Sequence, residues 1–289
     1  MKKLLVTGIS GFLGWHIARM PQTDWDITGT YHQNKVSIPS GKTLLLDLTD
    51  EAALASVLRK VKPSAVLHLA AASDPNFCEE NPQISQAVNV EATVHLAEYA
   101  ARKKIPFLFT SSDLVFDGQK GQYKETDQPS PVNRYGLHKA VAESKVAEIN
   151  PKAIIARLSL MYGLTDRTDN FLSGWLEKAK AGEAFQAFND EFRSPASGTD
   201  IARGLLLLLD NKAKGIWHLG GMERISRYEF ALKMATAFDF SPGLIEETKQ
   251  DEINMPATRP PDVSLNIEKA TSFGYQPESV EENLKFLAS

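Results

Sequence analysis

The first half of the chain alternates between short apolar runs and longer stretches with apolar residues at helical spacing. The apolar runs expected to form β-strands are residues 4–6, 25–30, 43–46 and 65–69, followed by a run within 106–118 and by 215–219. Continuous apolar runs of this length are typical of a parallel sheet that is covered by helices on both faces. The pattern therefore predicts an α/β fold with a doubly wound parallel sheet of the Rossmann type.

Helices are predicted where apolar residues recur every three or four positions. A capping Thr49 or Asp50 precedes the first such stretch, and Pro63 stops it. Ser226 and Glu229 have the spacing of a capping box at the start of another helix. The later helices are expected over about residues 84–102, 135–146, 169–181, 201–209, 226–238 and 279–288.

These elements suggest a chain of two parts, for which 289 residues suffice. Residues 1–157, with about 195–222 returning to it, are expected to form a nucleotide-binding Rossmann domain. About 158–194 and 223–289 are expected to form a smaller C-terminal substrate-binding part. A proline-rich, polar segment within it, residues 255–264, is expected to lie over the site.

Charge and cysteine content narrow the classes of protein that the chain can be. The formal net charge is -4 and no long run of one sign occurs, which argues against binding to nucleic acid or to a membrane surface. No apolar stretch approaches the ~20 residues needed to span a bilayer. Cys78 is the single cysteine, so no internal disulfide forms. We therefore expect a cytoplasmic protein, and the spacing of the histidines predicts no metal site.

Three glycines follow the first strand and open a helical pattern. The stretch reads Gly8, Ile9, Ser10, Gly11, Phe12, Leu13, Gly14. In a dinucleotide site the first glycine permits a tight turn, the second lets a pyrophosphate approach the backbone, and the third lets helix and strand pack closely. The anion then lies at the N-terminus of the helix, where free N–H groups favour it. We expect this stretch to bind a cofactor; the alternative is a purely structural glycine turn.

The ends of the second and third strands bear on the choice of cofactor. An NAD site usually has an acidic residue after the second strand, where it binds the ribose hydroxyls. This chain instead has Tyr31, His32 and Lys35. His32 and Lys35 are candidates for binding a 2′-phosphate, so NADP(H) is favoured and NAD(H) is possible; the alternative is an ordinary polar loop. Asp47 and Leu48 follow the third strand, and Asp47 is a candidate adenine contact.

Small residues follow the fourth strand. Ala70, Ala71 and Ala72 leave room for the ribose and phosphates of a cofactor. The loop that follows, residues 73–82, is expected at the carboxyl edge of the sheet, where substrates bind, and Asp74 in it is a candidate substrate contact. Cys78 in the same loop is expected to be a bystander, because no His and Asn partners are apparent.

Tyr135 and Lys139 are four residues apart, so on a helix they project from the same face. A phenol beside an ammonium is a plausible proton donor and acceptor, since a nearby cation lowers the phenol pKa from about 10. Ser111 and Ser112 add two hydroxyls at the end of the preceding strand. The tyrosine–lysine pair alone is a weak signal, because such pairs also arise by chance.

Together these motifs resemble the extended short-chain dehydrogenase/reductases, and within them the dTDP-4-dehydrorhamnose reductase-like branch. The first matches are Thr7-Gly8-x-x-Gly11-x-x-Gly14, His68-Leu69-Ala70-Ala71 and Ser111-Ser112-Asp113-x-Val115-Phe116-Asp117-Gly118. Those that follow are Tyr123-x-Glu125-x-Asp127 and Pro131-x-Asn133-x-Tyr135-Gly136-x-x-Lys139. Arg157 matches as well, and the resemblance places it after a sixth strand that precedes it in the chain. The last are Asp190-x-Phe192-x-Ser194-Pro195, Gly215-Ile216-Trp217-His218-Leu219 and Arg259-Pro260-x-Asp262-x-Ser264-Leu265. The resemblance covers nearly the whole chain.

The resemblance implies an NADPH-dependent reductase of a nucleotide-sugar-type ketone. In that reading Tyr135 protonates the new alkoxide, Lys139 holds the nicotinamide ribose and lowers the pKa of Tyr135, and Ser112 hydrogen-bonds the substrate carbonyl. Asp113 and Arg259 are further candidate substrate contacts; Arg259 pairs with a phosphate or carboxylate of the substrate, or is an ordinary structural arginine. The implied partner is a small nucleotide-sugar-like molecule, and a homodimer is possible.

Three departures from the branch pattern fall where substrate should bind. Leu114 stands where the branch usually has a tyrosine, residues 157–163 lack its usual tryptophan, and the loop 73–79 differs. They leave the sugar open and keep two alternatives to the reductase: a nucleotide-sugar epimerase or dehydratase, and a non-catalytic NADP-binding regulatory subunit that resembles the beta subunit of methionine adenosyltransferase. Dehydratases usually carry a glutamate where Leu114 stands, so dehydration is disfavoured.

Overall fold

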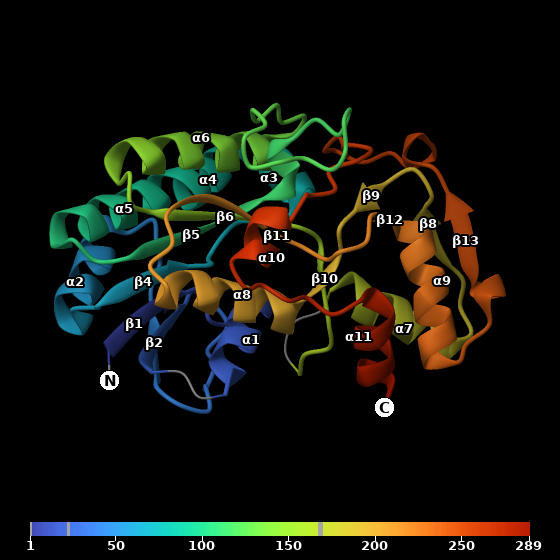
Figure 1. Cartoon of the computed structure of the whole chain (residues 1–289), viewed down its shortest axis with the longest axis horizontal. Helices are drawn as coiled ribbons and strands as arrows, with labels where there is room; N and C mark the ends of the chain where they lie inside the picture. Colours follow the sequence, from blue (N-terminus) through green and yellow to red (C-terminus); the bar gives the residue numbers. More distant parts are fainter. Residues whose placement is uncertain (1, 22–23, 167–169) are drawn as a thin grey trace.

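A computed structural model describes residues 2–21, 24–166 and 170–289 of the chain (Figure 1). Its centre is a seven-stranded sheet in the order β11-β6-β5-β4-β1-β2-β3. All neighbouring strands in this sheet are parallel. The strands are β1 (Lys2–Thr7), β2 (Trp25–Tyr31), β3 (Lys42–Leu45), β4 (Ala65–His68), β5 (Phe107–Ser112), β6 (Ile154–Leu158) and β11 (Gly215–Leu219). The doubly wound fold expected from the sequence is confirmed.

Successive residues of the central strands pack on opposite faces of the sheet. In β1, Leu4 and Val6 belong to the apolar core on one face, while Leu5 belongs to the core on the other. In β4, Leu67 and Val66 divide in the same way. All five side chains are fully buried. Burial on both faces explains why these strands read as continuous apolar runs rather than as alternating ones.

Helices cover both faces (Figure 1). Ile17 and Leu205, from the helices on one face, pack in the same core as Leu4, whereas Leu96 and Val146, from the other face, pack with Leu5. The helices of the first face are α1 (Phe12–Arg19) and α8 (Gly198–Asp210). Those of the second face are α2 (Glu51–Val61), α5 (Ala92–Lys103) and α6 (Arg134–Ile149).

The long helix expected over residues 84–102 is divided, and a further helix precedes it within the expected loop. Asp74 starts that helix by accepting the Asn76 backbone N–H at 2.8 Å. Pro75 and Pro82 each occupy a first turn, where the missing N–H of proline has no cost. The segments are α3 (Pro75–Glu80), α4 (Pro82–Gln86), a π-helical turn (Ala87–Glu91) and then α5.

A smaller group of elements lies at one end of the sheet (Figure 1). Leu172, Phe230 and Leu284 share an apolar cluster there and are at most 1% exposed. The helices and strands of this group are α7 (Phe171–Ala181), β8 (Phe185–Phe188), α9 (Arg227–Phe238), β13 (Ile245–Thr248) and α11 (Val280–Ala288). Ser226 caps α9 in the predicted capping box with Glu229. The predicted start of α7 at Asp169 lies outside the described residues, and Asn170 is its cap.

This separate cluster supports the two-part division of the chain, which we keep as a proposal. Val263 and Leu265, from the C-terminal third, pack instead in the core beside the sheet. The short elements that connect the two parts are β7 (Met161–Tyr162), β9 (Phe192–Arg193), β10 (Ala196–Ser197), β12 (Ile225–Ser226) and α10 (Glu268–Ser272). Single 3₁₀ turns occur at Asp113–Val115, Pro242–Leu244 and Gln250–Glu252.

Arg157 lies within β6 rather than after it, which corrects its predicted placement. It is 1% exposed, and its Nη2 donates to Glu143 Oε2 of α6 at 2.7 Å. His218 of β11 lies on its other side, with Nε2 at 3.5 Å from Arg157 Nη1. Because an unpaired buried charge is costly, this pairing lets an arginine occupy the interior between the sheet and α6.

Candidate active site

A cavity of about 900 Å³ lies at the carboxyl ends of the parallel strands. It lies where the neighbouring strands β1 and β4 send their connections to opposite faces of the sheet, which is the ligand position in doubly wound folds. The predicted site residues that line it are Gly8, Ser10, Gly11, Phe12, Leu13, Gly14, Tyr31, His32, Asp47, Leu48, Ala70, Ala71, Ala72, Asp74, Ser112, Tyr135 and Lys139. Lys35, Asp113 and Arg259 are not among the lining residues.

The lining also includes Ser111, one of the two hydroxyls noted at the end of its strand, and Ser73 and Phe77 of the loop expected at this edge. The lining residues that sequence reasoning missed are Thr30, Gln33, Leu46, Thr49, Leu69, Ile84, Val88, Thr110, Leu158 and Met161. Phe77, Ile84 and Val88 come from α3, α4 and the π-helical turn. The division of residues 75–91 into α3, α4 and the π-helical turn was not predicted, so the contribution of Ile84 and Val88 to the cavity wall was not predicted. The signal that could have indicated it is the position of these residues shortly after β4.

The glycine-rich turn fits a dinucleotide phosphate group. Gly8 has φ of +71°, and a Cβ there would lie 2.8 Å from the backbone of Ala70. Gly11 caps α1 without a side-chain hydrogen bond, and no acidic residue occurs in the first turn. The first N–H groups of α1 therefore face the cavity without a capping side chain, as an anion site requires.

At the side of the cavity formed by the ends of β2 and β3, Asp47 and His32 lie next to each other. Asp47 Oδ2 is 3.6 Å from His32 Nε2, and Oδ1 accepts from the N–H and hydroxyl of Thr49 at 2.9 and 2.7 Å. The hydrogen bonds from Thr49 lower the pKa of the Asp47 carboxyl. Lys35 is exposed and lies off the cavity wall, so the structure does not bring the predicted pair of cations together.

Ala72, which lines the cavity, is hydrogen-bonded to Asn89 of the π-helical turn. Asn89 Oδ1 accepts the Ala72 N–H and Asn89 Nδ2 donates to the Ala72 carbonyl, each at 2.9 Å. Asn89 is 1% exposed, and these two bonds satisfy its buried amide group. The Cys78 Sγ donates to the same carbonyl at 3.2 Å.

Tyr135, Lys139 and Ser112 converge on one end of the cavity. Asn133 fixes the start of α6 by accepting the Gly136 N–H at 2.9 Å. Lys139 Nζ donates to the Thr110 carbonyl at 2.7 Å and lies 5.9 Å from the centroid of the Tyr135 ring. Helix α6 thus presents the phenol and the ammonium to the carboxyl end of β5.

The pKa values of this group differ from the expectation. Burial raises the pKa of the Tyr135 phenol, and the charges of Asp113 and Cys78 raise it further, whereas a hydrogen bond with Ser112 lowers it. In the protein without a cofactor, burial and not the charge of Lys139 therefore determines the direction of the Tyr135 pKa shift. Burial lowers the pKa of Lys139 to about 7, although the Glu143 carboxylate raises it. Tyr135 is thus protonated at neutral pH and can act as a proton donor.

Asp113 and Arg259 do not occupy the predicted positions in the cavity wall. Asp113 is 4% exposed, and its carboxylate accepts from the Ser112 hydroxyl at 3.1 Å. Arg259 donates to Asn76 Oδ1 at 3.1 Å and to the Ala257 carbonyl at 3.2 Å, so it ties the proline-rich segment to α3. Asp74 does line the cavity, but one of its oxygens caps α3.

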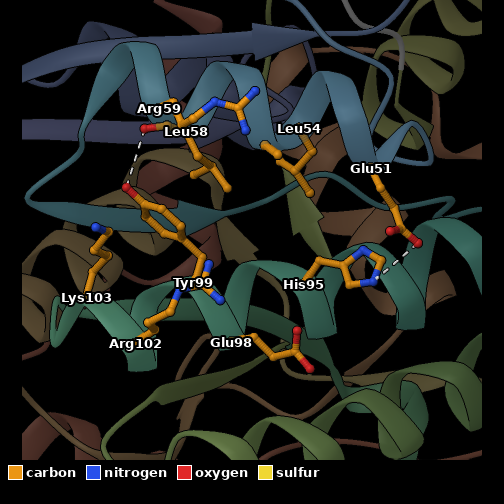
Figure 2. Close-up of a pocket in the computed structure, with 10 residues that line it drawn as sticks. Glu51, Leu54, Leu58, Arg59, His95, Glu98, Tyr99, Arg102 and Lys103 are labelled. Atoms are coloured by element: carbon orange, nitrogen blue, oxygen red, sulfur yellow. Dashed lines mark hydrogen bonds and ion pairs between the residues drawn. The ribbon is translucent and has the colours of Figure 1, made fainter.

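A second hollow of about 390 Å³ lies between α2 and α5, on the helix-covered flank of the sheet (Figure 2). Tyr99 donates to the Leu58 carbonyl across it at 3.4 Å, and His95 Nε2 lies 3.6 Å from Glu51 Oε1. None of the predicted site residues lines this hollow. Ser112, Tyr135 and Lys139 line the larger cavity instead.

Residues 2–21, 24–166 and 170–289 contain no group of three or more His, Cys, Asp or Glu side chains placed to hold a metal ion. Within the same ranges, no helix has the length and apolar character needed to cross a bilayer.

Comparison with known proteins extends over the whole chain. The model of the family "RmlD substrate binding domain" matches residues 1–288. The "Probable low-salt glycan biosynthesis reductase Agl14" of Haloferax volcanii is 30% identical over 288 residues, which cover 98% of this chain and 96% of that protein. The methionine adenosyltransferase 2 subunit beta of Xenopus laevis is 28% identical over 281 residues, covering 94% of this chain and 83% of that one.

Solved structures with the same fold include reductases. A hypothetical dTDP-4-dehydrorhamnose reductase from Sulfolobus tokodaii superposes with a TM-score of 0.86 at 31% identity, covering 96% of this chain and 98% of that chain. The dTDP-4-dehydrorhamnose reductase of Bacillus anthracis, in complex with NADP, has a TM-score of 0.88 at 23% identity and covers 99% and 98% of the two chains.

Proposed function

The chain belongs to the RmlD substrate binding domain family of extended short-chain dehydrogenase/reductases, and from this premise we propose that it is an NADPH-dependent reductase of a nucleotide-sugar-type ketone. One observation carries the proposal: Ser112, Tyr135 and Lys139 line the same cavity as the glycine-rich turn. A proton donor therefore lies in the space that a dinucleotide would share with its substrate.

The residues have separable roles in the proposed reaction. When bound, NADPH supplies the hydride that reduces the ketone carbon. Tyr135 donates its phenolic proton to the developing alkoxide, and its raised pKa keeps that proton in place until charge develops. Lys139 is held against the Thr110 carbonyl, from which its ammonium reaches the ribose side of the cavity. Ser112 donates a hydrogen bond to the reacting oxygen.

Two other functions on this fold remain alternatives. A regulatory role without turnover is favoured by the similarity to the methionine adenosyltransferase 2 subunit beta. The presence of Ser112, Tyr135 and Lys139 around one cavity argues against it, because a cofactor-binding subunit does not require a proton donor there. An epimerase would use the same three residues and differs in retaining NAD(P) through a reversible oxidation.

A turnover screen tests the proposal directly. The purified protein is mixed with NADPH and a set of nucleotide-linked 4-keto sugars, and NADPH oxidation is followed by the loss of absorbance of the reduced nicotinamide. We expect at least one 4-keto sugar to be reduced, and no oxidation without it. NADPH binding without turnover across the whole set would support the regulatory alternative instead.

Replacing His32 with alanine is expected to weaken the binding of NADPH more than that of NADH. His32 lines the cavity beside Asp47, at the position proposed for the 2′-phosphate. A hydrogen bond to the phosphate at this site contributes about 1 kcal/mol, so we expect a several-fold change in the ratio of the two dissociation constants. Nucleotide titrations followed by fluorescence measure it.

Lys35→Ala is the matched control, since Lys35 is exposed and lies off the cavity wall. It should leave the NADPH to NADH ratio near that of the parent protein. An equal loss of both nucleotides in His32→Ala would contradict a 2′-phosphate contact at His32. A larger effect of Lys35→Ala would assign that contact to Lys35, which the sequence suggested together with His32.

A further inference from the structure

The single hydroxyl hydrogen of Ser112 is committed to Asp113. Ser112 Oγ donates to Asp113 Oδ1 at 3.1 Å and accepts the Leu114 N–H at 3.2 Å. A serine hydroxyl donates one hydrogen bond and accepts two. In this arrangement Ser112 has no hydrogen left for the oxygen of a ketone or for the neighbouring Tyr135 phenol.

An ionised Asp113 therefore holds the hydrogen of Ser112 away from the substrate, and its charge raises the pKa of the Tyr135 phenol. The hydrogens of Ser112 and Tyr135 are those that the proposed reduction requires at the substrate oxygen. Asp113 itself is 4% exposed and lies outside the cavity lining, so it acts on the reaction only through its neighbours.

Two charged groups of a distant segment act electrostatically on the buried carboxyl. Arg193 of β9 places Nη2 at 3.1 Å from Glu191 Oε1, while its buried Nη1 has no hydrogen-bond partner among the described residues. Ser159, which follows β6, lies with its hydroxyl 3.5 Å from Asp113 Oδ2 and accepts the Ser194 N–H at 3.1 Å.

We propose that Asp113 is a positioning residue whose protonation releases the hydrogen of Ser112 toward the substrate oxygen and makes the Tyr135 phenol a better proton donor, and that Arg193 and Glu191 set how readily Asp113 is protonated. The proposal rests on the reductase function proposed above. One proton from solvent binds an oxygen of Asp113, and the resulting carboxylic acid donates to Ser112 Oγ. Ser112 then directs its own hydrogen into the cavity, and Tyr135 still supplies the proton that the alkoxide gains.

The electrostatics of the cluster agree with this arrangement. Burial raises the pKa of Asp113 to about 6, and the charge of Glu191 also raises this pKa. The charge of Arg193 and the hydrogen bonds from Ser112 and the Leu114 N–H lower it. The carboxylate also raises the pKa of Tyr135, so its protonation makes the phenol a better acid. The groups that interact with Asp113 come from five places in the fold: Ser112 of β5, Leu114 of the turn after it, Tyr135 of α6, Ser159 after β6, and Arg193 and Glu191 in and beside β9.

The test is the pH dependence of kcat/KM for keto-sugar reduction between about pH 5 and 8.5. The wild type should lose activity as pH rises, first through an ionisation near 6 and then through Lys139 near 7, each roughly tenfold per pH unit. Asp113→Asn, which keeps a donor toward Ser112, should lack the first ionisation. Its activity should begin to fall only near 7.

Two further variants give shifts of opposite sign. Arg193→Gln removes a cation, so the first ionisation should move to higher pH by about one unit or more. Glu191→Gln removes an anion, so it should move to lower pH. Thermal unfolding and NADPH titration of each variant establish that it is folded. A merely structural role for Arg193 and Glu191 would lower activity at all pH values without moving the profile in opposite directions.

A measurement without turnover separates this proposal from the reductase function. The infrared carbonyl band of a protonated carboxyl, identified by its loss in Asp113→Asn, should titrate with a midpoint near 6. If Asp113 stays ionised down to pH 4, or if Arg193→Gln and Glu191→Gln move the midpoint in the same direction, the proposal is wrong. A wild type that shows the titration but reduces no ketone would instead count against the reductase function and leave the control of Asp113 standing.

Discussion

Tyr135→Phe is expected to lower kcat by roughly 10²–10⁴-fold, the usual contribution of a positioned general acid. The substitution removes the phenolic oxygen and keeps the ring, which is 8% exposed and packed at the end of the cavity. Because the phenol acts on the reacting oxygen and not on the pyrophosphate, the dissociation constant of NADPH should stay within about twofold. Steady-state kinetics and a fluorescence titration of NADPH measure the two quantities on one preparation.

Tyr99→Phe makes the same chemical change away from the cavity. Tyr99 lines the hollow between α2 and α5, and its hydroxyl donates to the Leu58 carbonyl at 3.4 Å (Figure 2). This variant should turn over as the parent does. Turnover by Tyr135→Phe equal to that of the parent would remove Tyr135 from the proposed chemistry, whereas loss of both activity and NADPH binding would point to a collapsed site.

Gly14→Ala is expected to abolish tight NADPH binding and to destabilise the protein. A Cβ at this position would lie 2.5 Å from the Gly8 carbonyl oxygen and 2.6 Å from backbone atoms of Ile9. These atoms belong to the turn itself and cannot rotate away, so α1 must move off β1 and carry the phosphate site with it. Overpacking of this kind costs typically 1–3 kcal/mol. Thermal unfolding and nucleotide titration measure the two losses.

Gly11→Ala separates cofactor contact from folding. Its φ is -80°, which alanine accepts, and a Cβ there would meet only the Gly8 carbonyl oxygen at 3.4 Å. The variant should therefore unfold within a few degrees of the parent, yet bind NADPH weakly because the methyl group occupies the space of the pyrophosphate. A Gly14→Ala protein as stable as Gly11→Ala would show that close approach of helix and strand at Gly14 is not required.

Local signals were enough for the core of the fold and for the glycine-rich turn that lines the cavity. The strands β1 and β4 are short apolar runs because both faces are covered, and that property is written in consecutive residues. The spacing of Gly8, Gly11 and Gly14 likewise depends on backbone geometry within one turn. The caps Asp50 and Ser226 bond within three residues of themselves, so they too were readable.

The positions of Lys35, Asp113, Arg157 and Arg259 were decided by the tertiary structure. Whether a side chain at the end of a strand enters the cavity or the interior depends on the path of the chain after that strand and on what packs against it. Asp113 turns inward toward Ser159 and the charge of Arg193, which lie 46 and 80 residues further along the chain. The sequence by itself thus determined a dinucleotide fold with a serine, a tyrosine and a lysine to place, because periodicity and turn geometry are local. Only the assembled molecule decided which of the nearby charges line the cavity and which are buried behind its wall. Burial and electrostatic interactions join residues that are remote in sequence.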